Sequence, residues 1–176
     1  MWLSGLKNRL ANGDTALFRW FNRGCRVGFL DKAFSEATRL GSPFVVIPVC
    51  LGAWATGIEQ LRQTGLQGLI ALASSHAVVR LLKATVKRQR PYMVLSHVAV
   101  RGPRLRDLSF PSGHTAAAFS VATCFAATFP GIALLFTLLA SLVGVSRMYV
   151  GMHYPSDVIF GAFLGSASVW LARLLF

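Results

Sequence analysis

The chain has 176 residues, of which 54% are hydrophobic and only 14% are charged. Because a soluble domain carries about 25% charged residues, this composition argues against a water-soluble fold and favours an integral membrane protein. The 18 lysines and arginines outnumber the 6 acidic residues, which gives a formal net charge of +12. No nucleic-acid recognition motif accompanies this charge, so the expected partners are anionic membrane lipids or a phosphorylated substrate rather than nucleic acid.

The N-terminal region, residues 1–41, is predicted to lie along the membrane surface. Charged residues interrupt every apolar run in its first part, so it does not resemble a cleavable signal. Over 15–30, Leu17 and Trp20 share one helical face and arginines lie towards the other. This pattern is typical of an interfacial amphipathic helix with aromatic anchors.

Local signals set the expected bounds of that region. Asn12-Gly13-Asp14 is a plausible start for the amphipathic helix. A second short helix is expected over 31–40, and Gly41-Ser42-Pro43 separates it from the next apolar stretch.

The rest of the chain is dominated by apolar stretches that approach the length of a membrane-spanning helix, about 20 residues. They cover 43–58, 66–86, 113–129, 131–149 and 156–176. Their glycine, alanine and serine residues suit close packing between helices in lipid. We therefore predict one all-α domain over 1–176, with a transmembrane core at 42–176 formed by a bundle of about five transmembrane helices.

The only long polar connection is the basic loop 87–110. Irregular backbone is not tolerated in contact with lipid, so this loop must lie at one membrane surface. If the five stretches cross the membrane in turn, the turn at 150–155 lies on the same surface. We call this surface the loop face, and the polar residues at the helix ends there form the candidate site.

A stripe of cationic or titratable residues leads to the loop face. Its members are spaced i, i+4, i+7 and i+11, and they are His76, Arg80, Lys83 and Lys87. Because charges facing lipid are costly, the stripe is expected to face the bundle interior or to reach the surface. Lys83 is a candidate anion ligand, with snorkelling as the alternative. Arg80 suits a role in packing or in contact with lipid headgroups. His76 suits an interior position where its ring nitrogens have hydrogen-bond partners.

Ser112-Gly113-His114 opens the third apolar stretch. Free N–H groups at a helix start bind anions, and glycine allows an anion close to the backbone. The alternative is an ordinary helix cap with an incidental histidine.

His153 and Asp157 lie four residues apart, with Pro155 between them. Pro155 favours the first helical turn, which places Asp157 where its carboxylate can accept a hydrogen bond from His153 Nδ1. Such a bond would leave Nε2 as a free nucleophile. As the alternative, an acidic residue in the first turn of a helix is common simply because it interacts favourably with the helix dipole.

The loop face thus gathers two histidines, one carboxylate and three cations, Lys83, Arg90 and Arg147. Three fixed positive charges suit a phosphoryl group and would repel a divalent metal ion, so no metal is expected. The spacing of the cysteines matches neither a metal site nor a redox pair, and no disulfide is expected.

Three motifs carry a resemblance to the phosphatidic acid phosphatase type 2 (PAP2) superfamily. They are KATVKRQRP at 83–91, PSGH at 111–114 and SRMYVGMHYPSD at 146–157. They resemble the family signatures K-x6-RP, PSGH and SR-x5-H-x3-D in the same order and without departure.

The resemblance implies a role for each matched residue. His153 would form a phosphohistidine, Asp157 would orient it, and His114 would protonate the leaving oxygen. The residues that would hold the phosphoryl oxygens are Lys83, Arg90, Ser112, Gly113 and Arg147. No metal or other cofactor is implied. The residues alone leave open which histidine attacks, although the Asp157 partner favours His153.

The implied activity is hydrolysis of a lipid phosphate at headgroup depth by a small bacterial membrane enzyme. Undecaprenyl diphosphate, phosphatidylglycerophosphate and phosphatidic acid are the expected substrates. The alternatives are a polyprenyl-linked sugar phosphate and a protein that binds anionic lipids without chemistry. Arg101, Arg104 and Arg106 would suit either a diphosphate or surface anchoring.

Two signals conflict over the side of the membrane on which the loop face lies. Basic residues concentrate on the loop face, and the positive-inside rule places that face in the cytoplasm. The family resemblance implies an outer face for many members. The N-terminal basic residues are not catalytic, and they favour a cytoplasmic site.

Overall fold

The computed structural model describes residues 2–24 and 28–175, and within these ranges it contains helices and connecting segments without a strand. In chain order the helices are α1 (Trp2–Arg23), α2 (Gly28–Ala37), the 3₁₀ turn η1 (Thr38–Gly41), α3 (Pro43–Ala55), α4 (Glu59–Val86), α5 (Pro91–Val94), α6 (Gly113–Thr128), the 3₁₀ turn η2 (Pro130–Ile132), α7 (Ala133–Tyr149) and α8 (Pro155–Arg173). The predicted all-α class is confirmed for this part of the chain.

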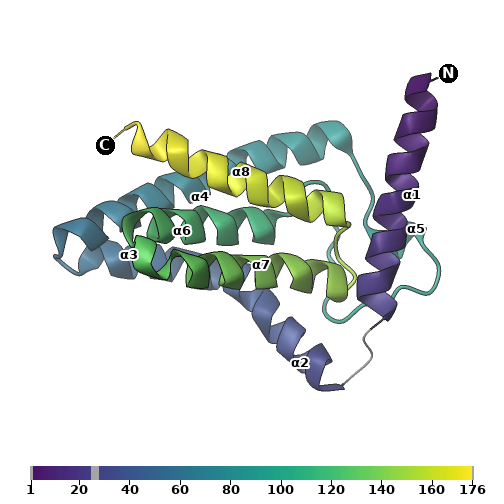
Figure 1. Cartoon of the computed structure of the whole chain (residues 1–176), viewed down its shortest axis with the longest axis horizontal. Coiled ribbons are helices and arrows are strands. Elements are labelled where there is room, and N and C mark those ends of the chain that lie inside the picture. The colour runs from purple at the N-terminus through teal and green to yellow at the C-terminus, as the bar shows by residue number, and fades with distance from the viewer. Residues whose placement is uncertain (1, 25–27, 176) are drawn as a thin grey trace.

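Helix α6 lies at the centre of the bundle and packs against α4, α7 and α8. Figure 1 shows α4, α6, α7 and α8 extending side by side, with α1 crossing one end of the bundle. That end is formed by the last turn of α7 and the first turns of α6 and α8. The helix ends that carry the three sequence motifs therefore meet at one end of the fold.

Two glycines of α8 permit a close approach to α6. A Cβ on Gly161 would lie 2.7 Å from the carbonyl oxygen of Ser112, and one on Gly165 would collide with the carbonyl of Ala116. Small residues at such positions let helix backbones pack closely in a membrane. This contact fixes the start of α8, which carries Asp157, against the start of α6, which carries His114.

The helices differ in their capacity to span a membrane. By length and composition, three of the described helical segments could cross it, or four if the bent pair Gly28–Gly41 and Pro43–Ala55 forms one span. Large apolar side chains on the outside of the bundle, such as Phe44, Leu134 and Phe163, are exposed as lipid contacts require. The five predicted stretches all form helices, but α3 and α6 have only 13 and 16 residues. At about 1.5 Å per residue these two are shorter than the hydrocarbon core, so a count of five spans is not confirmed.

The predicted bounds of the N-terminal helices are wrong. Helix α1 runs from Trp2 to Arg23 without a start at 12–14, and residues 25–27 of the expected helix 15–30 lie outside the described residues. The error arises because Asp14 does not cap a helix; its carboxylate accepts hydrogen bonds from the backbone N–H and the hydroxyl of Ser156. The second helix, predicted over 31–40, is formed by α2 and η1.

The two faces of α1 have different surroundings. Phe18 and Asn22 are buried against the bundle, and the Phe18 ring lies 5.6 Å from that of Tyr154. Leu17 and Trp20, the residues predicted to meet lipid, are exposed. The arrangement suits a helix that rests on the end of the bundle and presents an apolar face outward.

Replacing Gly165 with alanine tests the α6–α8 contact. The added Cβ meets backbone that cannot rotate away, so the free energy of unfolding should fall by about 1–3 kcal/mol. Thermal unfolding in detergent measures the change. Gly52→Ala is the matched control, because a Cβ there meets nothing within 4 Å. A melting temperature for Gly165→Ala equal to that of Gly52→Ala would contradict the assigned contact.

Candidate active site

A cavity of about 440 Å³ opens at the end of the bundle where the motifs meet. It lies among the end of α4, the segment that carries α5, the start of α6 and the turn between α7 and α8. Its wall includes Lys83, Arg90, Asp107, Gly113, His114 and His153. The structure therefore brings both histidines and two of the three predicted cations to one cavity.

His153 is buried in the turn between α7 and α8, with its two ring nitrogens in different surroundings. Nδ1 lies 3.6 Å from Asp157 Oδ2 and 3.5 Å from the hydroxyl oxygen of Ser109. Nε2 lies 3.2 Å from Nη1 of Arg90. Because a guanidinium can only donate, Nε2 accepts and Nδ1 carries the proton. This is the tautomer that a nucleophilic Nε2 requires.

The surroundings of His153 keep its ring neutral. Burial lowers the pKa of His153 to about 3; the Asp157 carboxylate opposes the decrease, and the positive charges of Arg147 and Arg90 add to it. The ring is therefore unprotonated at neutral pH, and its Nε2 lone pair faces Arg90.

Asp157 is held in the first turn of α8 by donors from the loop 87–110 and from the residue before the helix. Its Oδ2 accepts hydrogen bonds from the Ser109 hydroxyl at 2.5 Å and from the backbone N–H of Tyr154 at 2.9 Å. Its Oδ1 accepts one from Nη1 of Arg88 at 2.8 Å. The distance to His153 Nδ1 exceeds a normal hydrogen bond, so the pair is aligned but not tightly bonded in this state.

Lys83 and Arg90 converge on Asp107, which is not among the predicted site residues. Arg90 donates from Nη2 to Asp107 Oδ1 at 2.6 Å and from Nε to the Asp107 carbonyl at 2.9 Å. Lys83 donates to the other carboxylate oxygen and to the carbonyl of Leu108. A signal existed in the sequence, because Asp107 is the only acidic residue of the loop 87–110.

The charge of Asp107 persists at any physiological pH. Burial alone would raise its pKa, but the hydrogen bond from Lys83 and the charges of Arg90 and Lys83 outweigh that effect and lower the pKa to about 2. A carboxylate is thus paired with two of the three cations that were predicted to bind phosphate.

Arg147 is buried at the end of α7 and lacks part of its hydrogen bonding. Its Nη1 donates to the hydroxyl of Thr38 at 2.6 Å, whereas Nε and Nη2 have no partner among the described residues. Unpaired buried donors are costly, about 1–3 kcal/mol each. Arg147, the third predicted cation, is not among the residues that line the cavity.

Ser112 and Gly113 are placed differently from each other. Ser112 is the N-cap of α6: its hydroxyl accepts from the backbone N–H of Thr115, and its own N–H donates to the carbonyl of Asp157. Its side chain is buried and is not part of the cavity wall, whereas Gly113 and His114 are. The geometry favours the backbone at Gly113 and His114 over the Ser112 side chain as the phosphate-binding part of this motif.

The remaining basic residues divide into two groups. His76 and Arg80 line the cavity, so the predicted stripe faces it as far as Lys83, while Lys87 ends α4 in a left-handed conformation and is exposed. Arg101 pairs with Asp31 at 2.6 Å and stacks on Tyr149, which makes it an anchor of the loop.

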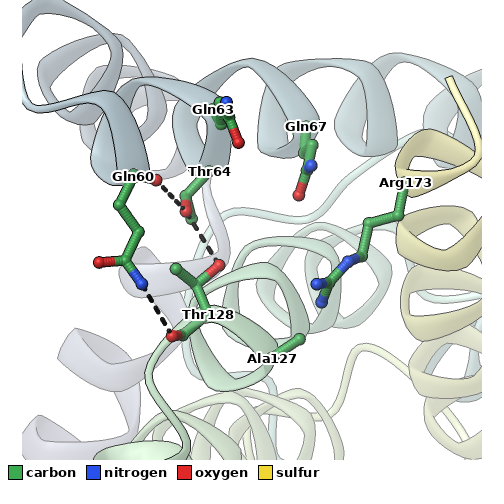
Figure 2. Close-up of a pocket in the computed structure, with 7 residues that line it drawn as sticks. All are labelled: Gln60, Gln63, Thr64, Gln67, Ala127, Thr128 and Arg173. Atoms are coloured by element: carbon green, nitrogen blue, oxygen red, sulfur yellow. Dashed lines mark hydrogen bonds between the residues drawn. The ribbon is translucent and has the colours of Figure 1, made fainter. Parts of the chain in front are cut away.

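A second pocket, of about 250 Å³, lies at the opposite end of the bundle (Figure 2). Its wall consists of Gln60, Gln63, Thr64, Gln67, Ala127, Thr128 and Arg173. These residues include one cation but no histidine or carboxylate, so this pocket has no pair like His153 and Asp157. The described residues also contain no group of three or more histidine, cysteine, aspartate or glutamate side chains placed to hold a metal.

The model of the PAP2 superfamily matches residues 64–176, which include all the cavity residues on α4, α6 and α7–α8. The chain therefore belongs to the PAP2 superfamily.

The chain is similar to two relatives and one solved structure in particular. An undecaprenyl-diphosphatase of Sulfolobus acidocaldarius is 30% identical over 162 residues, which cover 92% of this chain and 76% of that protein. A phosphatidylglycerophosphatase B of Bacillus subtilis is 29% identical over 164 residues, which cover 84% and 76%. The crystal structure of Aquifex aeolicus LpxE has a TM-score of 0.81 and 31% identity, and the match covers 90% of this chain and 93% of that one. The family and the apolar helices together indicate an integral membrane protein related to lipid phosphatases.

The position of Asp107 predicts that it competes with anions for Lys83 and Arg90. Asp107→Asn removes the competing charge, and inorganic vanadate should then bind about fivefold more tightly, as expected for loss of a partly exposed ion pair. Calorimetric titration of the purified protein measures this affinity.

Glu36→Gln is the matched control for this prediction. It removes one carboxylate from an exposed arginine pair on α2 and leaves the cavity unchanged. Equal vanadate affinities for the two variants would contradict competition by Asp107.

Proposed function

We propose that the protein is a membrane lipid phosphatase that hydrolyses a lipid phosphomonoester or diphosphate through a phosphohistidine on His153. The observation that carries the proposal is the orientation of the His153 ring, with Nδ1 towards Asp157 and Nε2 towards a cavity lined by cations. The lipid phosphatase relatives support the reaction class.

The first half of the reaction forms the phosphohistidine. Nε2 of His153 attacks phosphorus as the bond from phosphorus to the lipid oxygen breaks. The negative charge of the bound phosphate favours the protonated form of His114, which gives its proton to that oxygen. Asp157 stabilises the positive charge that develops on the ring. Arg90, which now contacts Nε2, moves onto the phosphoryl oxygens together with Lys83.

The second half releases inorganic phosphate. His114 takes a proton from water as the water oxygen attacks phosphorus, the bond to Nε2 breaks, and His153 returns to its neutral form. Lys83, Arg90, Arg147 and the N–H groups at the start of α6 stabilise the charge on the phosphoryl oxygens in both halves. These cations supply charge stabilisation that other phosphatases obtain from metal ions, so we propose that the enzyme is metal-independent.

A lipid substrate is supported by an apolar groove that adjoins the cavity. The groove, of about 370 Å³, lies among α3, α4 and α6 and shares Pro43, His76, Val79, Gly113 and Ala117 with the cavity wall. Phosphate in the cavity would leave an attached hydrocarbon chain next to this groove. The proposed substrates are undecaprenyl diphosphate, phosphatidylglycerophosphate and phosphatidic acid, with a polyprenyl-linked sugar phosphate as the alternative.

His153→Ala should reduce phosphate release from the preferred lipid by at least about 10⁴-fold, because the nucleophile is lost. The assay uses purified protein in detergent with a panel of the lipids named above. Wild-type protein should also retain radiolabelled phosphate after an alkaline quench, and the variant should not. Thermal unfolding of the variant confirms that it is folded.

Two outcomes would overturn the proposed function. Wild-type protein that binds these lipids but releases no phosphate would be a lipid-binding protein without catalysis. Activity in His153→Ala close to that of wild type would remove His153 as the nucleophile.

We further propose that the cavity faces the cytoplasm, on the strength of the basic residues of the loop face. Ser96 is exposed in the loop 87–110, whereas Cys50 and Cys124 are buried. In a Cys25→Ser background, Ser96→Cys should react with a membrane-impermeant maleimide only after the cells are permeabilised. Labelling of intact cells would place the cavity on the outer face.

A further inference from the structure

The catalytic carboxylate is linked to α1 through Arg88. The Arg88 guanidinium lies between two carboxylates: Nη1 donates to Asp157 Oδ1 at 2.8 Å, and Nη2 donates to Asp14 Oδ2 at 2.6 Å. The exposed fractions of these side chains are 27% for Arg88, 0% for Asp157 and 11% for Asp14. The guanidinium also stacks on the Tyr154 ring, 3.9 Å from its centroid. Both charge pairs are therefore shielded and geometrically fixed.

Asp14 also binds the residue next to the catalytic carboxylate. Its Oδ1 accepts from the backbone N–H of Ser156 at 2.9 Å, and its Oδ2 accepts from the Ser156 hydroxyl at 2.6 Å. Arg88 Nη1 donates to the same hydroxyl oxygen at 2.7 Å. One carboxylate of α1 thus holds the first turn of α8 both directly and through Arg88.

We propose that Asp14 is a positioning residue for the phosphatase reaction, acting through Arg88 on Asp157. The inference rests on the proposed function and assigns α1 a part in catalysis as well as in membrane contact. Neither Asp14 nor Arg88 belongs to the wall of the cavity, so neither contacts the phosphoryl group.

The electrostatic reason is that Asp157, Arg88 and Asp14 form a row of charges of alternating sign. Asp157 must stabilise the positive charge that forms on His153 during attack. The positive charge of Arg88 would by itself weaken the effect of the Asp157 carboxylate on His153. The Asp14 carboxylate, on the other side of Arg88, partly neutralises that positive charge. Without the Asp14 carboxylate, the full charge of Arg88 faces Asp157, and the transition state at His153 is less stabilised.

Asp14→Asn should therefore lower kcat about tenfold and leave KM within twofold of wild type. KM is preserved because the cavity and the cations that hold phosphate are unchanged. Phosphate release from the preferred lipid at saturating and limiting concentrations gives both constants. Glu36→Gln, which removes the carboxylate of an exposed arginine pair, is the matched control and should keep both constants at the wild-type values.

A double-mutant cycle tests whether Arg88 transmits the effect. Arg88→Lys keeps the charge but cannot bridge two carboxylates with a planar fork. If Asp14 acts through Arg88, the loss of kcat caused by Asp14→Asn should be several-fold smaller in the Arg88→Lys background. Losses that multiply independently would overturn the proposed chain.

The other outcomes separate this inference from the proposed function. An inactive wild-type protein overturns the proposed function. With active wild type, an Asp14→Asn variant that keeps its kcat overturns the inference. The inference is also overturned if Asp14→Asn loses activity only in proportion to a lowered melting temperature, because the role of Asp14 would then be structural.

Discussion

The burial of the Asp157 carboxylate is the constraint on which the end of the fold beside the cavity depends. A buried charge is costly unless hydrogen bonds and an opposite charge compensate for it. Asp157 obtains them from Arg88 and Ser109, at the two ends of the loop 87–110, and from the backbone of Tyr154. Each of these segments must therefore be in place before His153 has an oriented partner. The same requirement ties the loop 87–110 to the start of α8.

The charge distribution of the cavity is matched to an anion. Lys83, Arg90 and Arg147 concentrate positive charge, and Asp107 balances two of these residues in the structure. Arg147 has only the Thr38 hydroxyl as an acceptor among the described residues, and Nε and Nη2 stay unpaired. Displacing Asp107 would free Lys83 and Arg90 for an arriving phosphoryl group.

Sequence patterns were reliable where the physical signal is local. The apolar stretches became helices, and Ser112 caps α6 as its position before Gly113 suggests. Predictions from sequence patterns were wrong where a tertiary contact replaced a local one. Asp14 follows Asn12-Gly13 and resembles a helix start, yet α1 continues through it because its carboxylate binds Ser156. The lengths of α3 and α6 likewise left the predicted five spans unconfirmed.

The sequence by itself determined the helical class and the PAP2 membership, because hydrophobic stretches and motif spacing are read within short windows of the chain. Only the tertiary structure decided which ion pairs form in and beside the cavity. Asp107 lies between Lys83 and Arg90, and Arg88 joins Asp14 to Asp157, partners 74 and 69 residues away in the chain. Ion pairs over such separations leave no periodic trace in a sequence, because folding alone brings their charges within reach.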